Sequence, residues 1–399
     1  MLTVEEAQAH LLAVQPGPVE SVSLSALAGR VLARDVFSPV ALPPFRQSSM
    51  DGYAIRCEPG RESWALAGET RAGDPPAPLL GLGQARRIFT GAPVPDGADV
   101  VVRQEMAERF EAEGDKRVRF TGEHEEPGRF VRGAGSAVEE GAMILPAGTE
   151  LRPGALGFLA ACGIASAEVY RLPVVRILGS GDELIPPGQP LGPGQIYESN
   201  TYALEAAVRA CGVADVQARC LPDDPDVMAQ AVAEDMAAAD FLILSGGISV
   251  GEHDHVGRVL ADAGVETIFY KVAQKPGKPL FFGRRGEQWV FALPGNPASS
   301  LVTFWEYART ALRQYMGHAQ LGEAALPSEL LPLAHALEHR SPRAAFERAF
   351  VQDGWVRSLD GQDSYQLRSL AQANALLCLP VGPVAYAEGD LVTVHKLGG

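Results

Sequence analysis

The sequence predicts a multidomain α/β protein that contains one doubly wound, mostly parallel sheet. The chain has 399 residues, more than the roughly 250–300 that a single hydrophobic core usually serves. Hydrophobic residues make up 46% and charged residues 21%, so we expect packed domains rather than disorder. Between residues 173 and 317, apolar strand-like runs alternate with helical segments, which is typical of a doubly wound sheet.

Residues 1–45 and 141–172 are predicted to be mainly helical and to pack together as a linker domain. The first segment carries a helical apolar face made of Val4, Ala7, Leu11 and Leu12. The second predicts a helix over 154–162, with Pro153 in the first-turn position where proline is favoured. The block between them, 46–140, has short apolar runs split by Gly, Pro and Asp, and we expect an inserted β-rich domain there. Its runs are 64–66, 85–89, 100–102 and 118–120.

Residues 173–317 form the predicted α/β domain. Its expected strands are 174–178, 213–221, 241–244, 268–270, 280–282 and 289–293. Its expected helices cover about 200–211, a segment opened by Asp224 and Pro225, 256–263 and 298–316. The remaining residues, 318–399, contain short strand-like runs and turns, and predict a small C-terminal domain resembling a β-barrel. Those runs are 355–356, 376–379 and 391–394.

Charge and segment composition exclude several classes of partner. With 34 basic and 49 acidic residues, the formal net charge is −15, which argues against a chain that coats DNA or an anionic membrane. The N-terminus has neither a basic nor an apolar signal region, and the longest apolar stretch, 155–167, is interrupted by glycine. The five cysteines are scattered without a CxxC pair. We therefore expect a cytoplasmic protein with reduced thiols, bound to neither nucleic acid nor membrane.

Glycine-rich turns follow three of the predicted strands, at 179–181, 245–247 and 294–297. In open α/β sheets, ligands bind beyond the carboxyl ends of the strands. Glycine lets backbone N–H groups approach an anion closely, so three such turns at one edge favour a phosphate or other anion site. The sequence contains no GxxxxGK[ST] motif, and the turn at 179–181 lacks the third glycine of GxGxxG, which excludes the usual nucleotide motifs.

Lysines and carboxylates gather in the same predicted loops. A KPGK turn contains Lys275 and Lys278, and Lys271 lies four residues before it. The three lysines form either a phosphate-binding cluster or a solvated basic turn. Acidic residues lie at 182–183, at 223–224, at 252 and at 254, with Asp51 in the β-rich part. They suit Mg²⁺, which needs one or two carboxylates together with ligand phosphates. Asp223 could instead be only a helix cap.

Six collinear motifs carry a resemblance to a known family. They are PPFRQSSMDGYA at 43–54, IFTGAPVP at 88–95, GSGDEL at 179–184, SGGISVGEHD at 245–254, KPGKP at 275–279 and LPGNP at 293–297. With them, the sequence resembles the molybdopterin molybdenumtransferases, which include bacterial MoeA and the E domain of gephyrin. The resemblance covers residues from about 40 to 300, with a weaker LAQAN match at 370–374.

The resemblance implies a four-part homodimer in which the doubly wound domain binds molybdopterin. The implied reaction takes molybdate and adenylylated molybdopterin, uses Mg²⁺, and gives molybdenum cofactor and AMP. Other cofactor-biosynthesis proteins or apo-molybdoenzymes are implied partners. Such chemistry depends on charge neutralisation and positioning, so no covalent nucleophile is needed.

By matching position along the chain, the resemblance also assigns site residues. The carboxylates implied at the catalytic and metal site are Asp51, Glu183, Asp223 and Asp254. The residues implied to bind the pterin and its anionic groups are Thr90, Ser180, Gly246, Gly247, Ser249, Lys271, Lys275, Lys278, Pro294, Gly295 and Pro297. In the family dimer, the β-rich domain of one subunit faces the α/β cleft of the other, so Asp51 and Thr90 are expected to act on the partner's site.

Two segments depart from the family pattern. An acidic stretch near the end of the inserted domain is replaced by Gly135, Ser136, Ala137 and Val138, and a Gly-Ser-Gly-like segment near the C-terminus reads Asp363, Ser364, Tyr365. The lost acid at Ala137 keeps open a pterin-binding or scaffolding protein with weak catalysis. A molybdopterin adenylyltransferase is a further alternative, although the regions 1–170 and 318–399 would be superfluous in that enzyme.

Overall fold

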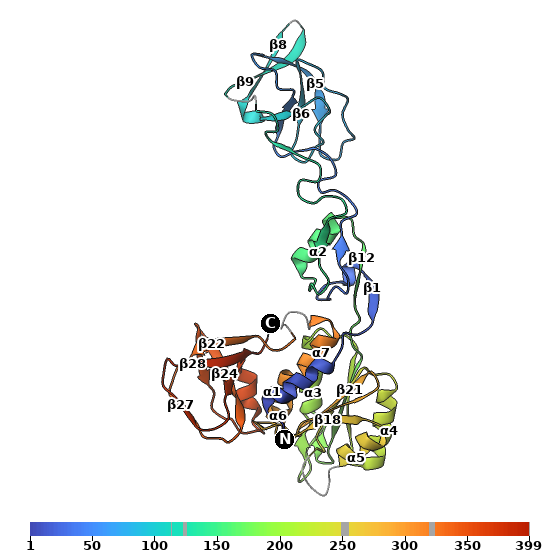
Figure 1. Cartoon of the computed structure of the whole chain (residues 1–399), viewed down its shortest axis with the longest axis vertical. Helices are drawn as coiled ribbons and strands as arrows, with labels where there is room; N and C mark the ends of the chain where they lie inside the picture. The colour runs from blue at the N-terminus through green and yellow to red at the C-terminus, as the bar shows by residue number, and fades with distance from the viewer. Residues whose placement is uncertain (113, 123–125, 249–254, 319–323, 399) are drawn as a thin grey trace. The chain divides into compact units, whose positions relative to one another are not determined.

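The computed structural model describes the chain except for residues 113, 123–125, 249–254, 319–323 and 399 (Figure 1). The described chain divides into two compact units. The larger unit comprises residues 1–20, 29–33 and 168–399, and the smaller unit comprises residues 21–28 and 34–167. None of the helices in the described ranges is both long and apolar enough to cross a membrane.

The larger unit contains the predicted doubly wound sheet. Its strands are β13 (Val175–Ser180), β16 (Val216–Leu221), β17 (Phe241–Ser245), β18 (Glu266–Tyr270), β20 (Phe281–Arg285) and β21 (Gln288–Leu293). Their order is β16-β13-β17-β21-β20-β18. The first four strands are parallel, and β20 is antiparallel to both of its neighbours. The expected mostly parallel sheet is therefore confirmed, with one reversed strand.

Helices cover both faces of this sheet (Figure 1). They are α3 (Asn200–Ala210), α4 (Pro225–Met236), α5 (His255–Asp262), α6 (Pro297–Thr303) and α7 (Arg309–Tyr315). Alternate strand residues point to opposite faces, so β17 sends Ile243 into the core shared with α3, α6 and α7, and Leu244 into the core shared with α4 and α5. The predicted helix over 298–316 is interrupted by a π-helical turn, Phe304–Ala308.

Capping residues explain where two helices begin. Asp224 accepts hydrogen bonds from the backbone N–H groups of Asp226 and Val227, and Pro225 occupies the first turn of α4, as predicted. Helix α1 (Val4–His10) starts with a capping box between Thr3 and Glu6.

The buried face of α1 belongs to the α/β core. Val4, Ala7 and Leu11 lie in one cluster with Val175 and Phe269 of the sheet, whereas the sequence suggested packing against 141–172. Leu12, expected on the same face, is 69% exposed, because the chain continues as a short 3₁₀ turn, Leu11–Ala13. The α/β sheet thus buries the apolar stripe of the first helix.

The C-terminal part of the larger unit is a second sheet with a short helix, α8 (Leu367–Gln372). Its strands are β19 (Gln274–Lys275), β22 (Ser328–Pro332), β24 (Ala344–Gln352), β25 (Trp355–Ser358), β26 (Ala375–Leu379) and β28 (Leu391–Lys396). The three predicted runs fall in β25, β26 and β28. Strand β19 belongs to the KPGK segment, so that segment is joined directly to the C-terminal sheet. Two-stranded ribbons flank these sheets: β14 (Leu184–Ile185) with β15 (Ile196–Tyr197), and β23 (Leu337–His339) with β27 (Val384–Tyr386).

The smaller unit is built around a β-sheet, as its turn-rich sequence predicted. The strand order is β7-β4-β6-β5-β9-β8. These strands are β4 (Gly52–Ile55), β5 (Trp64–Thr70), β6 (Gln84–Ile88), β7 (Val100–Arg103), β8 (Ala107–Ala112) and β9 (Asp115–Phe120). Two apolar clusters, one around Trp64 and one around Ile88, form its core.

Shorter elements complete the smaller unit. Helix α2 (Pro153–Ala161) begins at the predicted proline. The paired short strands are β2 (Val36–Phe37) with β11 (Met143–Leu145), and β3 (Gln47–Ser48) with β10 (Val131–Arg132). Strands β1 (Val19–Ser23) and β12 (Ser166–Tyr170) pair with each other. Short 3₁₀ turns occupy Leu24–Ala26 and Gln104–Met106.

Candidate active site

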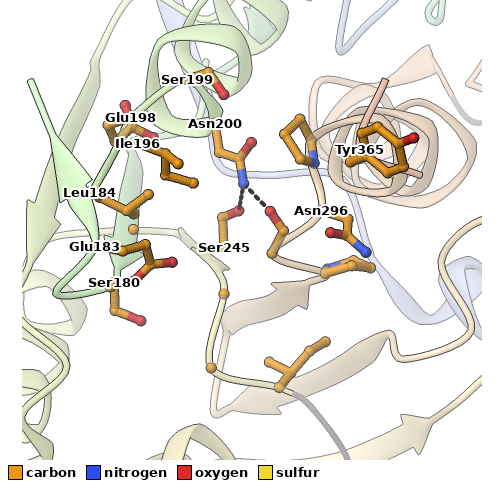
Figure 2. Close-up of a pocket in the computed structure, with 18 of the residues that line it drawn as sticks. Ser180, Glu183, Leu184, Ile196, Glu198, Ser199, Asn200, Ser245, Asn296 and Tyr365 are labelled. Carbon is orange, nitrogen blue, oxygen red and sulfur yellow. Dashed lines mark hydrogen bonds between the residues drawn. The ribbon is translucent and has the colours of Figure 1, made fainter. Parts of the chain in front are cut away.

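A cavity of about 650 Å³ lies at the carboxyl ends of β13, β17 and β21 in the larger unit. Figure 2 shows side chains from these strand ends and from the start of α3 around it. The sequence-predicted site residues that line the cavity are Ser180, Glu183, Asp223, Gly246, Gly247, Pro294, Gly295 and Pro297. The three glycine-rich turns therefore meet at one edge of the sheet, as the strand-end argument predicted.

Two glycines allow the turns to approach closely. Gly246 has a φ of +100°, and a Cβ atom there would lie 3.0 Å from the carbonyl oxygen of Ser180. Gly247 has a φ of +66°, and its Cβ would lie 2.6 Å from a methyl carbon of Val256. A side chain at either position would be strained and would crowd its neighbours, so glycine keeps backbone at the cavity surface.

Asn200 joins two of these turns. Its side-chain Nδ2 donates to Ser245 Oγ at 3.0 Å and to the carbonyl oxygen of Gly295 at 2.7 Å (Figure 2). Ser245 Oγ also lies 3.3 Å from Ser300 Oγ. The sequence placed Asn200 only at the start of the helix expected over about 200–211. The one sequence feature that could have marked Asn200 as a site residue is its position at the start of the predicted helix α3.

Two of the predicted carboxylates, Glu183 and Asp223, are exposed at the cavity. The backbone N–H of Asp223 donates to Asp182 Oδ1 at 3.0 Å, which ties their loops together. A third carboxylate, Glu198, was missed by the sequence reasoning. It is only 4% exposed and accepts hydrogen bonds from the N–H and hydroxyl of Thr201 at 2.8 and 2.7 Å. Glu198 is thus a structural anchor of the cavity wall.

The described residues contain no group of three or more His, Cys, Asp or Glu side chains placed to hold a metal ion. Asp254 and Ser249, which the sequence assigned to the metal and pterin sites, lie outside the described residues. Mg²⁺ commonly binds through one or two protein carboxylates and completes its shell with phosphate and water. Glu183 and Asp223 fit that minimal donor set.

The three predicted lysines do not line this cavity. Lys275 instead lines a second cavity of about 200 Å³, with Arg340, Ser341 and Arg348 of the C-terminal part. Lys271 places its Nζ 4.7 Å from the centre of the Tyr270 ring, within cation–π range. The side chain of Lys278 is exposed. From the KPGKP segment, only Pro279 reaches the main cavity.

Asp51 and Thr90, in the smaller unit, contact each other directly. Asp51 Oδ1 accepts hydrogen bonds from the backbone N–H and the hydroxyl of Thr90, both at 2.8 Å. The backbone N–H first, and then the hydroxyl and the nearby Arg87 charge, lower the pKa of Asp51. The next residue, Gly52, must be glycine because a Cβ would lie 2.0 Å from the carbonyl oxygen of Val102. The motifs at 43–54 and 88–95 thus come together at Asp51, whose carboxylate is ionised and held by Thr90.

Known proteins match this chain along its length. Residues 2–163 match the MoeA N-terminal region (domain I and II), residues 176–314 match a probable molybdopterin binding domain, and residues 331–397 match the MoeA C-terminal region (domain IV). A molybdopterin molybdenumtransferase of Haemophilus influenzae is 33% identical over 100% of both chains. The chain belongs to the MoeA family of molybdopterin molybdenumtransferases.

Further relatives agree with this membership. A molybdopterin molybdenumtransferase of a Nostoc species is 36% identical, over 95% of this chain and 88% of its own length. Two solved structures of a molybdopterin biosynthesis MoeA protein from Pyrococcus horikoshii are 27% identical, with TM-scores of 0.85 and 0.80. They cover 100% and 99% of this chain, and 100% of their own chains. The resemblance inferred from the motifs and the fold class predicted from the sequence are therefore confirmed.

The two departures from the MoeA pattern lie in different surroundings. Ala137 lines a separate cavity of about 500 Å³ in the smaller unit, beside Pro43 and Arg132. Ser364 Oγ accepts a hydrogen bond from Asn296 Nδ2 at 3.0 Å, and its carbonyl oxygen accepts one from the Ala298 N–H, also at 3.0 Å. The C-terminal segment is therefore fastened to the loop that follows β21.

Proposed function

We propose that this protein inserts molybdate into adenylylated molybdopterin and releases AMP and molybdenum cofactor. The observation that carries the proposal is the cavity of about 650 Å³, which combines glycine-rich turns with two exposed carboxylates. It lies in a chain that is related over its whole length to named molybdenumtransferases.

Small residues at the strand ends suit the phosphate part of the substrate. Gly246 and Gly247 bring bare backbone to the cavity surface, and Ser180 and Ser245 add hydroxyl groups there. Oriented backbone N–H groups and hydroxyls are common phosphate ligands. We assign the phosphate-bearing part of the pterin to these residues and to the loop containing Pro294, Gly295 and Pro297.

Glu183 and Asp223 are the proposed Mg²⁺ ligands of the described chain, with Asp254 as a third by motif position. Bound Mg²⁺ would neutralise charge on the phosphoanhydride that is cleaved. The two carboxylates hold and orient the anionic substrate through the ion, so their removal should weaken substrate binding as well as turnover.

Asp51, Thr90 and the lysines complete the proposal. We propose that the protein is a homodimer in which Asp51 and Thr90 act at the partner's cavity. Lys271, Lys275 and Lys278 are proposed to hold anionic groups. Lys275 lines a cavity of its own, whose wall carries Arg340 and Arg348 together with the carboxylates of Glu338 and Glu347.

We further propose that the protein works in the cytoplasm and passes its product to apo-molybdoenzymes or other cofactor-biosynthesis proteins. The absence of a candidate membrane span in the described helices is compatible with this location.

The reaction is tested with purified protein, adenylylated molybdopterin, Mg²⁺ and molybdate. We expect AMP release that depends on molybdate, together with activation of an apo-molybdoenzyme. Tight pterin binding without AMP release would overturn the enzymatic proposal and favour the scaffolding alternative. A matched reaction without molybdate controls for hydrolysis of the substrate alone.

A further inference from the structure

Tyr365 is an exposed aromatic side chain on the wall of the main cavity. It is 65% exposed, although it lines the same cavity as Ser180 and Ser245. Within the described part of the chain, its side chain makes no hydrogen bond and no ring contact. A large apolar ring left open inside a cavity is a feature of ligand-contact surfaces.

The backbone that carries Tyr365 is firmly held. The preceding residue, Ser364, is hydrogen bonded to Asn296 and Ala298. The carbonyl oxygen of Asp363 accepts a hydrogen bond at 3.0 Å from Arg348, which is only 1% exposed. Because the two residues before it are anchored, the backbone of Tyr365 is held at the cavity while its ring stays unpacked, which lowers the cost of ordering this segment on ligand binding.

The cavity has apolar surfaces on two sides of a polar floor. In Figure 2, Tyr365 lies on the side away from Leu184 and Ile196, with Asn200 and Ser245 between them. Ile196 is 54% exposed, so both sides offer apolar surface to a ligand. A matching ligand carries flat ring systems on either side of a polar, anionic centre.

We propose that Tyr365 stacks on a planar nitrogen heterocycle of the substrate. The inference rests on the proposed function, since adenylylated molybdopterin carries two such rings, the pterin and the adenine, on either side of its phosphates. Offset stacking on a tyrosine ring is favourable for any flat heteroaromatic system.

The test compares wild type with Tyr365→Ala, Tyr365→Phe and Tyr365→Trp. Affinity is measured without molybdate by titration with adenylylated molybdopterin, AMP and molybdopterin separately. We expect Tyr365→Ala to weaken binding of the complete ligand about tenfold or more, whereas Tyr365→Phe stays close to wild type. In Tyr365→Trp, stacking should quench the added indole fluorescence. Tyr202→Ala, at a tyrosine that is 57% exposed outside the cavity, is the matched control.

The separate titrations identify the ring. Loss of AMP affinity alone assigns Tyr365 to adenine, and loss of molybdopterin affinity alone assigns it to the pterin. If Tyr365→Ala binds the complete ligand as tightly as wild type while wild type turns it over, the stacking proposal fails and the proposed function stands. If the wild-type protein does not bind adenylylated molybdopterin, both fail. Thermal melting confirms that each variant is folded.

Discussion

Glu306 and His395 lie 89 residues apart in the sequence and meet as a largely buried pair, with His395 Nδ1 2.9 Å from Glu306 Oε1. Their side chains are 2% and 20% exposed. Glu306 lies in the π-helical turn before α7, His395 lies in β28, and Gln8 of α1 donates to Glu306 Oε2 at 3.3 Å. One carboxylate thus connects the first helix, the α/β domain and the C-terminal sheet.

This pair predicts a pH-dependent stability of the larger unit. Burial alone lowers the pKa of His395, but the hydrogen bond and the charge of Glu306 outweigh it and raise that pKa above its ordinary value. The stabilisation is then complete below the unfolded-state pKa of about 6.5 and is lost as the pH rises through the higher folded-state pKa. Burial raises the pKa values of the adjacent Cys378 and Tyr307, so both stay neutral in this range.

Urea unfolding of wild type and Glu306→Gln, from about pH 6 to about pH 9, measures this effect. We expect Glu306→Gln to cost about 1.5–3 kcal/mol at the acidic end, because a hydrogen bond to a charged group is lost, and less at the alkaline end. His335→Gln, in the same C-terminal part, is the control. An equal loss at both ends of the pH range would show that His395 is not charged by this partner.

Asp51→Ala should impair turnover much more than folding. The carboxylate receives both hydrogen bonds of Thr90 and is ionised at neutral pH, since its pKa is lowered. We expect AMP release to fall about a hundredfold, the scale of losing a fixed electrostatic group, with an almost unchanged melting temperature. Asp74→Ala, at an exposed acid of the smaller unit, should leave both unchanged. A collapse of the melting temperature in Asp51→Ala would assign Asp51 a structural role instead.

Asn200→Ala should loosen the cavity floor. The substitution removes the bonds to Ser245 and Gly295, at a cost of about 1–3 kcal/mol. In a unit of this size the melting temperature should fall by several degrees. We expect substrate affinity to fall at least tenfold, because the Gly295 loop loses its tether. Tyr202→Ala, at an exposed position of α3 outside the cavity, serves as the control. Unchanged affinity in a destabilised Asn200→Ala protein would show that the tether serves folding alone.

Removal of divalent metal should abolish AMP release, and Mg²⁺ should restore it. Because Glu183 and Asp223 are the proposed ligands, Glu183→Gln and Asp223→Asn should each raise the Mg²⁺ concentration needed for half-maximal rate by about tenfold or more. Asp262→Asn, at an exposed acid in the last turn of α5, should not change it. Equal Mg²⁺ requirements in all three variants would remove both carboxylates from the metal site.

Local sequence signals predicted most elements of the larger unit. Asp224 and Pro225 placed the start of α4, and buried apolar runs placed β13, β17 and β21, because caps and strand burial depend on residues close together in the chain. The sequence predicted the structure less well where packing against distant segments determines it. The sequence predicts a strand from residue 213, but residues 213–215 lie before β16. It also places Leu12 on the buried helical face, but Leu12 is exposed. The predicted division into four domains stays a prediction.

The site showed the same contrast. Motif positions marked Ser180, Glu183 and the glycines that line the cavity, and an acidic loop after a predicted strand marked Asp223. These residues come together because strand ends in a parallel sheet converge by topology. Asn200, Glu198 and Tyr365 carried no motif, and their importance appears only in contacts with residues far along the chain. The proposed roles of Asp254 and Ser249 stay predictions.

The sequence by itself determined the family, the doubly wound sheet and the edge of that sheet at which the glycine-rich turns meet. These follow from short motifs and from hydrophobic periodicity, which report on residues near one another in the chain. Only the tertiary structure decided that α1 belongs to the α/β core, that Lys275 faces a separate cavity, and that Tyr365 reaches the main one. Each depends on packing between segments tens to hundreds of residues apart, and periodicity carries no information about such contacts.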